Sequence, residues 1–537
     1  MFIYNYERRN ASSVKVGDQY IGGNHPILIQ SMANTSTLDT IGSANQAKAI
    51  VDAGGKLVRF TTQGVKEAAN LEKIRVEMER LGCNVPISAD VHFNPKAAFV
   101  AAHTADKVRI NPGNFVDAAR TFRKIEFSDE EYAREINRIR ETLIPFLKLC
   151  AECNTAVRLG VNHGSLSDRI MSRYGDSAPG MVESVMEFLR IAAEIDFKDI
   201  VISIKASNTV VMVQAVRLLA EQMRREGMNF PLHLGVTEAG DAEDGRIKSA
   251  VGIGALLHEG LGDTIRVSLS EPPEDEIPVA QLLCDHVARR KNVRVIEPGT
   301  VLPGPARDYA HDAIAKSPAA KLFPMAATKE LARFNEYPNL RADGSKDIVR
   351  IVSANSEELG RVASDIDVMV ASGCADPVIV ELKYNCDSLD ELRVRAGADF
   401  GALLLSGYAS GIKVTDPGFS EDELYQLELD ILQAARMRIS KTEYISCPSC
   451  GRTLFDLPAA LYDVKQAVDA LDIKGLKIAV MGCVVNGPGE MADADYGYVG
   501  AGPGRVSLYK GKELVVKNIP ASEALPALLR LIAGHQS

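Results

Sequence analysis

Three cysteines near the C-terminus have the spacing of ligands to a metal centre. Cys447 and Cys450 flank a Pro-Ser pair in ISCPSCGR, and Cys483 follows in MGCVVNGPGE. Both segments read as junctions between a strand and a loop that contains Gly and Pro, and such backbone can fold around an inorganic core. On spacing alone, the pair of thiols fits a zinc ion, a redox dithiol or an iron–sulfur cluster.

The three alternatives differ in how well they explain the third thiol. A thioredoxin-like dithiol would sit at a helix N-terminus and would leave Cys483 without a role. Structural zinc prefers Cys and His ligands, but no His lies between positions 312 and 534. A cluster held by three thiolates, where four are usual, would leave one iron available to a further ligand or a substrate. The residues therefore favour a cluster, with Glu490 as a candidate fourth ligand, and leave zinc and the dithiol open.

The remaining cysteines lack this context. Cys150 and Cys153 are also separated by two residues, but IPFLKLCAECNTAV reads as a helix leading into a strand, and the thiols have no Gly or Pro beside them. We expect both to be buried or half-buried helix residues. Core positions are expected for the isolated cysteines, which are Cys83, Cys284, Cys374 and Cys386.

A second set of reactive side chains ends a series of short apolar segments in the first half of the chain. The candidates are Arg59, Asp90, His92, Arg109, Asn111, Arg158, Asn162, His163, Lys205, Glu238, Arg266 and Ser268. Side chains i and i+2 of a strand share a face, so the pairs 90/92, 109/111 and 266/268 are each expected to point the same way.

Cationic residues on five of these segments indicate an anionic ligand. Burying like charges together is costly unless an anion joins them, and the arginine fork suits phosphate. We predict a ligand with two or more negative charges, most simply a diphosphate; salt bridges to loop carboxylates are the alternative. Asp90, His92 and Glu238 are the candidates for acid–base chemistry, although each could instead hold an arginine in place.

The elements that must position these residues read as repeating strand–helix units. Strand-like segments lie at 27–32, 57–62, 85–92, 107–111, 156–162, 200–205, 232–238 and 264–269, with amphipathic segments between them. Such alternation predicts parallel strands. Eight units match a (β/α)8 TIM barrel of about 250 residues, whose function sits at the C-terminal ends of the strands. An open doubly wound sheet is the alternative.

The chain as a whole reads as an α/β protein of three domains. We expect the barrel at 1–280, an inserted second α/β domain at 281–435, and a C-terminal α+β domain at 436–537. The insert has strand-like runs at 348–355, 368–373, 377–384 and 401–407, which fit a degenerate barrel or a smaller sandwich. The last domain combines the strands TEYIS and LKIAVMG, the helix LPAALYDVKQAVDALD, a hairpin that turns at 510–512, and a closing helix.

Composition excludes several classes of partner. The net charge of −10, the absence of Trp and an aromatic content of 6% argue against nucleic-acid binding. The N-terminus has no apolar signal region, and no uninterrupted apolar run approaches the roughly 20 residues that span a bilayer. We therefore expect a cytoplasmic protein without a membrane span.

Together these motifs resemble a known family. YISCPSCGR, MGCVVNGPGE and DADYGYVG, behind a barrel that carries RFTTQG, SADVHF, RINPGN, RLGVNHGS, IKAS and GVTEAG, closely resemble the 4-hydroxy-3-methylbut-2-enyl diphosphate synthase family of iron–sulfur enzymes. The resemblance covers the barrel and the last hundred or so residues. The intervening stretch departs from the two-domain form and is similar to the insert of the longer, three-domain form.

The resemblance implies a role for each candidate residue. A [4Fe-4S] cluster would be bound by Cys447, Cys450, Cys483 and Glu490. The diphosphate would be held by Arg59, Arg109, Arg158 and Lys205, with Asn111, Asn162, His163, Arg266 and Ser268 nearby. Glu238 would be the leading acid–base residue, assisted by Asp90 and His92.

The implied reaction is the reductive opening and dehydration of methylerythritol cyclodiphosphate to hydroxymethylbutenyl diphosphate. Two electrons would come from a flavodoxin or a ferredoxin. The cluster domain would close either on the barrel of its own chain or on that of a partner in a homodimer. The rival from another class is an iron–sulfur electron carrier with a barrel-shaped docking module, which would bind no diphosphate; a pterin-binding barrel with zinc in the tail is a further alternative.

Overall fold

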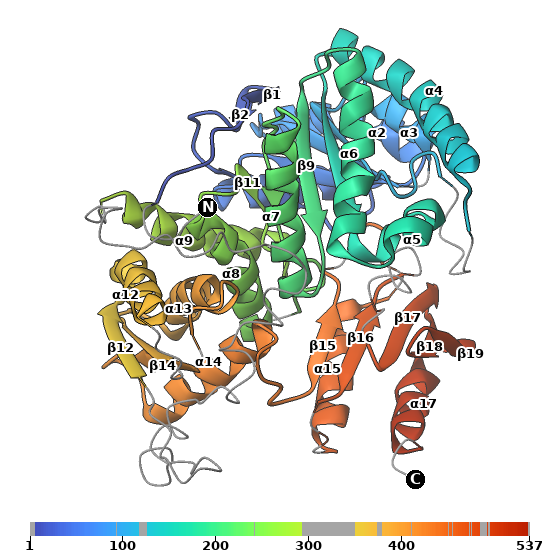
Figure 1. Ribbon diagram of the computed structural model, residues 1–537. Coiled ribbons are helices and arrows are strands. Elements are labelled where there is room, and N and C mark those ends of the chain that lie inside the picture. Colours follow the sequence, from blue (N-terminus) through green and yellow to red (C-terminus); the bar gives the residue numbers. More distant parts are fainter. Residues whose placement is uncertain are drawn as a thin grey trace.

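The fold is known from a computed structural model. It describes residues 6–92, 94–117, 126–240, 242–292, 350–372, 378–409, 411–448, 450–453, 455–471, 473, 475–483, 491 and 494–534. Figure 1 shows the barrel in blue to green, the second unit in yellow to orange and the C-terminal unit in orange to red.

The first unit is a closed parallel barrel. Its strands are β3 (Leu28–Ile29) with β4 (Ser31–Met32), β5 (Val58–Thr62), β6 (Ile87–Val91), β7 (Lys107–Ile110), β8 (Ala156–Asn162), β9 (Ile200–Lys205), β10 (His233–Leu234) and β11 (Thr264–Ile265). They pair in the orders β4-β5-β6-β7-β8-β9 and β10-β11-β3. A bridge between Ile202 and Leu232 joins β9 to β10, and Gln30 links β3 to β4 in one segment. All eight predicted segments therefore contain strand, and the closed barrel is confirmed over the open sheet.

Helices surround this barrel, as the amphipathic segments predict. They are α1 (Thr40–Asp52), α2 (Val65–Arg80), α3 (Pro95–Ala101), α4 (Asp129–Cys153), α5 (Asp168–Tyr174), α6 (Ala178–Glu194), α7 (Thr209–Arg225), α8 (Ala242–His258) and α9 (Glu276–Ala288). Local signals start them: the side chains of Asp39, Ser128 and Asn208 cap α1, α4 and α7 by accepting backbone N–H groups. The barrel floor is covered by the antiparallel hairpin β1 (Val14–Val16) and β2 (Gln19–Ile21).

The second unit is smaller. Among its described residues, β12 (Arg350–Asn355), β13 (Val378–Lys383) and β14 (Gly411–Thr415) form a three-stranded parallel sheet, accompanied by α12 (Leu359–Ala371), α13 (Leu389–Leu404) and α14 (Glu421–Ala434). Two predictions were wrong: the apolar runs at 368–373 and 401–407 cover the C-terminal ends of α12 and α13, because a short apolar run does not separate a buried helix from a strand.

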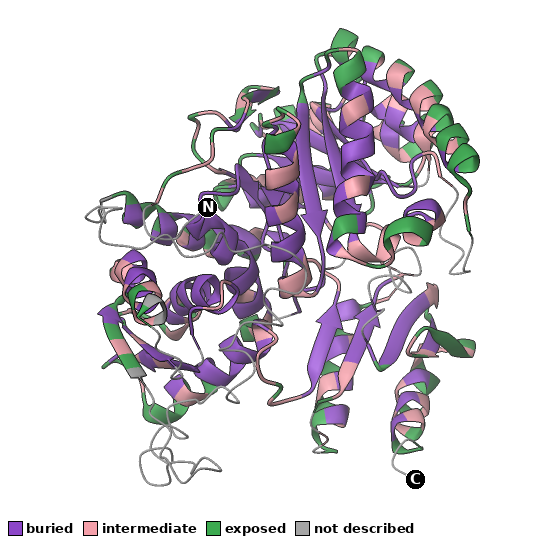
Figure 2. Ribbon diagram, viewed as in Figure 1, coloured by how far each residue is buried: buried purple, intermediate pink, exposed green. Residues whose placement is uncertain are grey.

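Close packing of two helices fixes the second unit to the barrel. Most of α8 and α13 is buried, as the purple ribbon of Figure 2 shows. The helices meet through small residues: a side chain at Gly254 would collide with Ala398, and one at Gly401 would collide with Val251. Helices that are buried on all sides need such close partners on every face.

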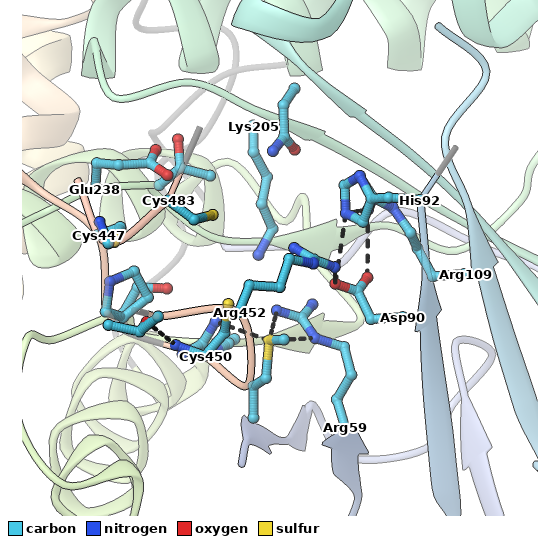
Figure 3. A pocket seen from close by; sticks show the side chains of 18 of the residues that line it. Arg59, Asp90, His92, Arg109, Lys205, Glu238, Cys447, Cys450, Arg452 and Cys483 are labelled. Carbon is cyan, nitrogen blue, oxygen red and sulfur yellow. Dashed lines mark hydrogen bonds and ion pairs between the residues drawn. The ribbon is translucent and has the colours of Figure 1, made fainter. Parts of the chain in front are cut away.

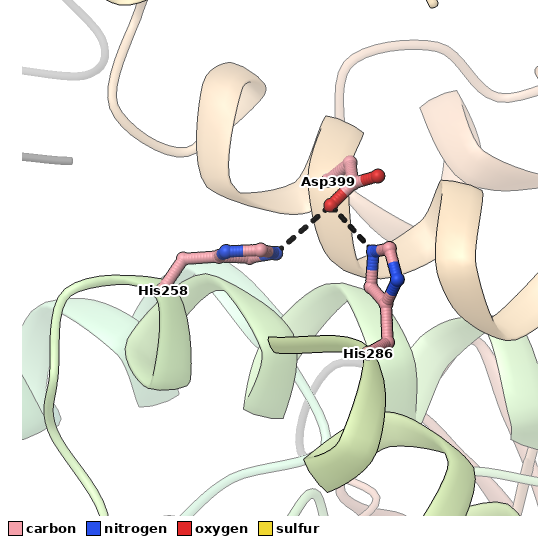
Figure 4. Close-up of side chains that lie close together, drawn as sticks. All are labelled: His258, His286 and Asp399. Carbon is pink, nitrogen blue, oxygen red and sulfur yellow. Dashed lines mark hydrogen bonds and ion pairs between the residues drawn. The ribbon is translucent and has the colours of Figure 1, made fainter. Parts of the chain in front are cut away.

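A buried polar cluster lies at the same junction (Figure 4). Asp399 Oδ1 lies 3.0 Å from His258 Nε2 and 2.8 Å from His286 Nε2, and Asp399 Oδ2 accepts a hydrogen bond from the Tyr384 hydroxyl at 3.1 Å. Arg290, which can only donate, lies 3.1 Å from His258 Nδ1. The Nε2 edge of His258 therefore faces Asp399, and the group fits a buried polar junction between the barrel and the second unit.

The third unit is a mixed five-stranded sheet. Its strands are β15 (Glu443–Ser446), β16 (Lys477–Met481), β17 (Tyr496–Gly502), β18 (Arg505–Lys510) and β19 (Glu513–Pro520), with the helices α15 (Leu457–Asp469) and α17 (Ala521–Ala533). The predicted strands, both helices and the hairpin all occur. Gly511 provides the left-handed residue, with φ of 55°, in the tight turn between β18 and β19. The domain boundaries predicted at 280 and 435 stay predictions.

Candidate active site

One cavity brings together residues from both ends of the chain. It encloses about 770 Å³, part of it open to solvent, between the C-terminal ends of the barrel strands and the loops after β15 and β16. Thirteen of the predicted residues line it. They are Arg59, Asp90, His92, Arg109, Arg158, Asn162, Lys205, Glu238, Arg266, Ser268, Cys447, Cys450 and Cys483. Figure 3 shows the labelled cations and thiols around this space.

Three predicted residues are not among those that line the cavity. Asn111 lies just past the end of β7; its side chain donates to Ser165 Oγ at 2.9 Å and accepts the N–H of Gly113. It therefore braces a loop, although Arg109, two residues earlier, lines the cavity. His163 directly follows β8, and its Nε2 atom lies 3.0 Å from the carboxylate of Asp176. Glu490 lies outside the described residues.

The barrel wall of the cavity is strongly cationic. Five of its side chains are Arg or Lys and two are carboxylates, and Arg452 adds a sixth cation from the loop after β15. Room for these long side chains comes from two glycines, one on β8 and one directly after β10. A Cβ at Gly160 would lie 2.6 Å from Arg109 Nε, and a Cβ at Gly235 would lie 2.6 Å from Lys205 Nζ. Small residues at these two positions thus allow the cations to converge.

Asp90 is the carboxylate around which the arginines are ordered. Its Oδ1 accepts from Arg109 at 3.3 Å and from Arg158 at 3.2 Å, and its Oδ2 lies 3.5 Å from His92 Nε2. Burial raises the pKa of Asp90, but the charges of Arg109 and Arg59 outweigh burial and hold this pKa well below its ordinary value. Asp90 is therefore ionised, and it holds two arginines in place.

His92 is buried against the same group. Arg109 contacts its Nε2 atom, and burial, together with the charges of Arg109 and Arg452, lowers the pKa of His92 to about 3. The imidazole is thus neutral at physiological pH. A neutral ring between guanidinium groups adds no further positive charge to a wall that is already cationic.

The other cations differ in how far they are already paired. Arg266 forms two hydrogen bonds to Glu276, at 3.0 and 2.8 Å, so the salt-bridge alternative holds for this residue. Arg59 donates to the sulfur of Met32 at 2.8 Å. Within the described part of the chain, Arg59 and Lys205 have no ion-pair partner. These two side chains therefore leave charge for a ligand.

Glu238 occupies an unusual backbone position. It is buried, lines the cavity, and has a φ of 48°, in the left-handed region that costs a residue with a side chain roughly 1–3 kcal/mol. Its charge acts on the thiol of Cys447 across the cavity. Backbone strain of this kind is found at sites where the direction of a side chain matters.

The three thiols form the opposite wall. Cys447 Sγ accepts the N–H of Gly482 at 3.3 Å, next to Cys483. Burial raises the pKa of Cys447 to about 12, so its thiolate needs a bound cation. The three thiols do not all lie within 4.8 Å of one another. Among the described residues, His258, His286 and Asp399 are the three potential metal-binding side chains that meet this distance.

The loop after β15 carries Cys447 and Cys450, is named the cluster loop, and contacts the barrel of the same chain. The Ser270 hydroxyl donates to the carbonyl of Cys447 at 3.1 Å, and a bridge joins Ala239 to Ser446. On the other side of the cavity, Gln63 donates to the carbonyl of Gly451 at 3.2 Å. The structure thus places both walls of the cavity within one chain.

Salt bridges hold the segment that leads into the third unit. Lys248 on α8 lies 2.8 Å from Glu443 at the start of β15, and Arg436 contacts the same carboxylate. Lys441 bridges Asp244 and Asp430 at 2.7 and 2.8 Å. The strand β15, which leads directly into Cys447, is therefore anchored to the barrel.

Seven residues that line the cavity were not among the sequence candidates. They are Met32, Thr237, Pro448, Arg452, Thr453, Met481 and Gly482. Arg452 could have been found, because it ends ISCPSCGR and adds a sixth cation to the set.

The prediction for Cys150 and Cys153 is confirmed: both lie on α4, one buried and one half-buried. Cys83 and Cys284 are buried and Cys386 is half-buried, whereas Cys374 lies outside the described residues.

Comparison with known proteins identifies the family. Residues 11–281 match the GcpE TIM-barrel domain, and residues 443–534 match the GcpE protein C-terminal domain. The chain belongs to the GcpE family. The first match covers the predicted barrel, and the second covers the unit that carries the three thiols.

Curated relatives extend along the whole chain. A protein of Bacteroides fragilis named 4-hydroxy-3-methylbut-2-en-1-yl diphosphate synthase (flavodoxin) is 49% identical over 100% of this chain and 97% of its own length. A chloroplastic protein of Oryza sativa, named as the ferredoxin form, is 36% identical over 99% of this chain and 88% of its own. GcpE relatives thus include this chain's second unit. No helix among the described residues is long and apolar enough to cross a membrane.

Proposed function

We propose that this chain is a 4-hydroxy-3-methylbut-2-enyl diphosphate synthase, which reductively opens and dehydrates 2-C-methyl-D-erythritol 2,4-cyclodiphosphate. One observation carries the proposal: a barrel wall with five cations and a wall with three thiols and Arg452 face the same cavity in one chain. The names of relatives that match the full length support it.

The cationic wall binds the diphosphate. Arg59, Arg109, Arg158 and Lys205 provide the charge, and Asp90 fixes the direction of two of the guanidinium groups. Arg forks that are ordered before the ligand arrives lose little freedom on binding, so they position the phosphates precisely enough for chemistry at the far end of the cavity. Asn162, Arg266 and Ser268 complete this wall, with Asn111 and His163 as supports in the flanking loops.

The thiol wall fits a [4Fe-4S] cluster. Ligands of one zinc ion lie about 3.8 Å apart at a Zn–S distance of about 2.3 Å, whereas the three thiols form no group within 4.8 Å. A cluster takes each thiolate on a different iron, which suits this wider spacing. Cys447, Cys450 and Cys483 would bind it, with Glu490 as the proposed fourth ligand. When bound, the cluster supplies electrons one at a time from a flavodoxin or ferredoxin donor.

Glu238 is the proposed acid–base residue. It points from the barrel wall toward the thiol wall (Figure 3), so a ligand that spans the cavity would reach it. Asp90 is fully engaged with arginines and His92 is neutral between them, so we assign both to positioning the cations. We place the reaction in the cytoplasm, because a chain whose cysteines include three proposed cluster ligands suits a reducing compartment.

The test is an anaerobic assay. The purified chain, supplied with reduced flavodoxin, should convert the cyclodiphosphate to the butenyl diphosphate, and it should contain iron and acid-labile sulfide. Cys447→Ala, Cys450→Ala and Cys483→Ala should each lose activity and iron, whereas Cys153→Ala, the matched control with the same CxxC spacing, should keep both. Zinc without sulfide would refute the proposal.

A further inference from the structure

A second polar layer lies inside the barrel, beneath the cavity. Lys107 begins β7 two residues before Arg109, so both side chains point to the same face. Lys107 is fully buried, and its Nζ has no hydrogen-bond partner among the described residues. In the described ranges, both ring nitrogens of His233, which begins β10, and the hydroxyl of Ser88 on β6 also lack hydrogen-bond partners. Buried polar groups without partners are rare and indicate a role that needs them.

The layer is closed from below. The barrel floor is a cluster of fully buried apolar side chains from the hairpin and the strand starts, namely Val14, Val16, Ile21, Leu28, Leu57, Ala156 and Val201. This apolar floor separates the layer from solvent at that end of the barrel. A charged ligand in the cavity would therefore act on Lys107 through the barrel interior.

The surroundings of Lys107 disfavour an ammonium. Arg158 on β8 and Arg59 on β5 act on it as like charges, and the attraction of Asp106 beside it is weaker. Burial, with these two arginines, holds the pKa of Lys107 well below its ordinary value. The buried ring of His233 lies in the positive field of the same arginines and of Lys205. A lysine can shed its proton in such a place, whereas an arginine cannot.

We propose that Lys107 is a neutral amine in the ligand-free barrel and takes up a proton from solvent when a diphosphate binds in the cavity above it. The anion reverses the local field, because it places negative charge beside the arginines that disfavoured the ammonium. The amine and the incoming proton form an ammonium, which balances part of the charge of the ligand. The barrel thus carries this extra cation only while an anion is bound. This proposal rests on the proposed function, since it takes the ligand to be a diphosphate.

The test is calorimetric counting of protons. Inorganic diphosphate is titrated into the holoenzyme, under anaerobic conditions and near neutral pH, in buffers of different ionisation enthalpy. Lys107→Met removes the amine and Lys107→Arg keeps a cation that cannot lose its proton. Lys198→Met, at an exposed lysine, is the control. Both Lys107 variants should take up about one proton fewer per bound diphosphate than the wild type and the control. The protons of the ligand itself cancel in this difference.

Affinity gives an independent readout. The association constant for diphosphate should fall with rising pH more steeply in the wild type than in Lys107→Arg, because the wild type takes up an additional proton on binding. The two association constants should diverge by about tenfold per pH unit. Equal proton counts in the wild type and both variants, with diphosphate bound, would overturn this proposal alone. Failure of diphosphate to bind the wild type would overturn the proposed function, and this proposal with it. Iron content of each variant confirms that the folded holoenzyme is compared.

Discussion

The guanidinium of Arg452, two residues after Cys450, lies 3.7 Å from the carboxylate of Asp90 in the barrel. Asp90 also accepts hydrogen bonds from Arg109 and Arg158. A residue of the cluster loop therefore shares its counter-ion with the arginines of the barrel. This contact links the position of the thiols directly to the order of the anion-binding wall.

Arg452→Gln should weaken the closure of the cluster loop on the barrel. Loss of this charge leaves the thiol wall less firmly placed, and a displacement of about 1 Å can cost about 10²-fold in rate. We expect kcat/KM to fall by about that factor with iron and sulfide unchanged. Arg505→Gln, on the exposed hairpin, is the control and should keep full activity. Full activity of Arg452→Gln would show that the contact has no role in closure.

Glu238→Gln separates the proposed enzyme from an electron carrier. It keeps the shape of the side chain but removes its proton chemistry, which typically contributes 10²–10⁴-fold to rate. We expect a loss of kcat in about this range, with diphosphate affinity changed little. A carrier would tolerate the change.

Glu238→Gly should be as inactive, but more stable to denaturant than Glu238→Ala, because glycine adopts the left-handed backbone of this position without strain.

Asp399→Asn should loosen the junction between the barrel and the second unit. The substitution leaves the buried donors of His258, His286 and Tyr384 with one acceptor oxygen in place of a carboxylate. Broken buried networks of this kind cost about 3–5 kcal/mol, and we expect a loss of that order in the free energy of unfolding by urea. Asp390→Asn is the matched control, because Asp390 lies on the same helix with its side chain 58% exposed. Equal stability of the two variants would contradict the account of the junction.

His92 should make stability depend on pH below neutrality. Its pKa is about 3 in the folded chain, against about 6.5 when unfolded, so the unfolded chain binds the proton first as the pH falls. Stability is thus full above about pH 6.5 and declines toward about pH 3, and one such group accounts for about 2 kcal/mol between pH 7 and pH 5. In His92→Gln this part of the decline should vanish, which urea unfolding at the two pH values would measure. An unchanged decline would show that His92 is protonated in the folded chain.

Sequence patterns predicted the parts of the protein that depend on local residue order. The eight strand segments follow from alternation of apolar runs and amphipathic helices, and the three thiols stood out by their spacing and their Gly- and Pro-containing loops. The wrong strand at 401–407 is the end of a helix that is buried on all sides, so it lacks the periodicity that identifies a surface helix. The wrong strand at 368–373 is the end of α12, where Val368 is exposed, and a run this short does not separate a helix from a strand.

Other features depend on contacts between distant segments. Arg452 gains its role only because its loop lies over Asp90, more than three hundred residues earlier. Lys107 reads as the polar first residue of a strand until the barrel closes around it. Asn111 shows the limit of the parity rule, since it lies beyond the last residue of β7 and its side chain turns to Ser165.

The central claim is that one chain holds both walls of the active site. Complementation tests it most directly: Arg109→Leu, defective in the barrel, and Cys450→Ser, defective in the cluster loop, are co-expressed with different tags and purified through both tags where they associate, or mixed where they do not. We expect no recovery of the conversion of cyclodiphosphate, because each chain then combines one intact wall with one defective wall in the same active site. Substantial recovered activity would show that the cluster loops close on the barrel of a partner, and would contradict this claim.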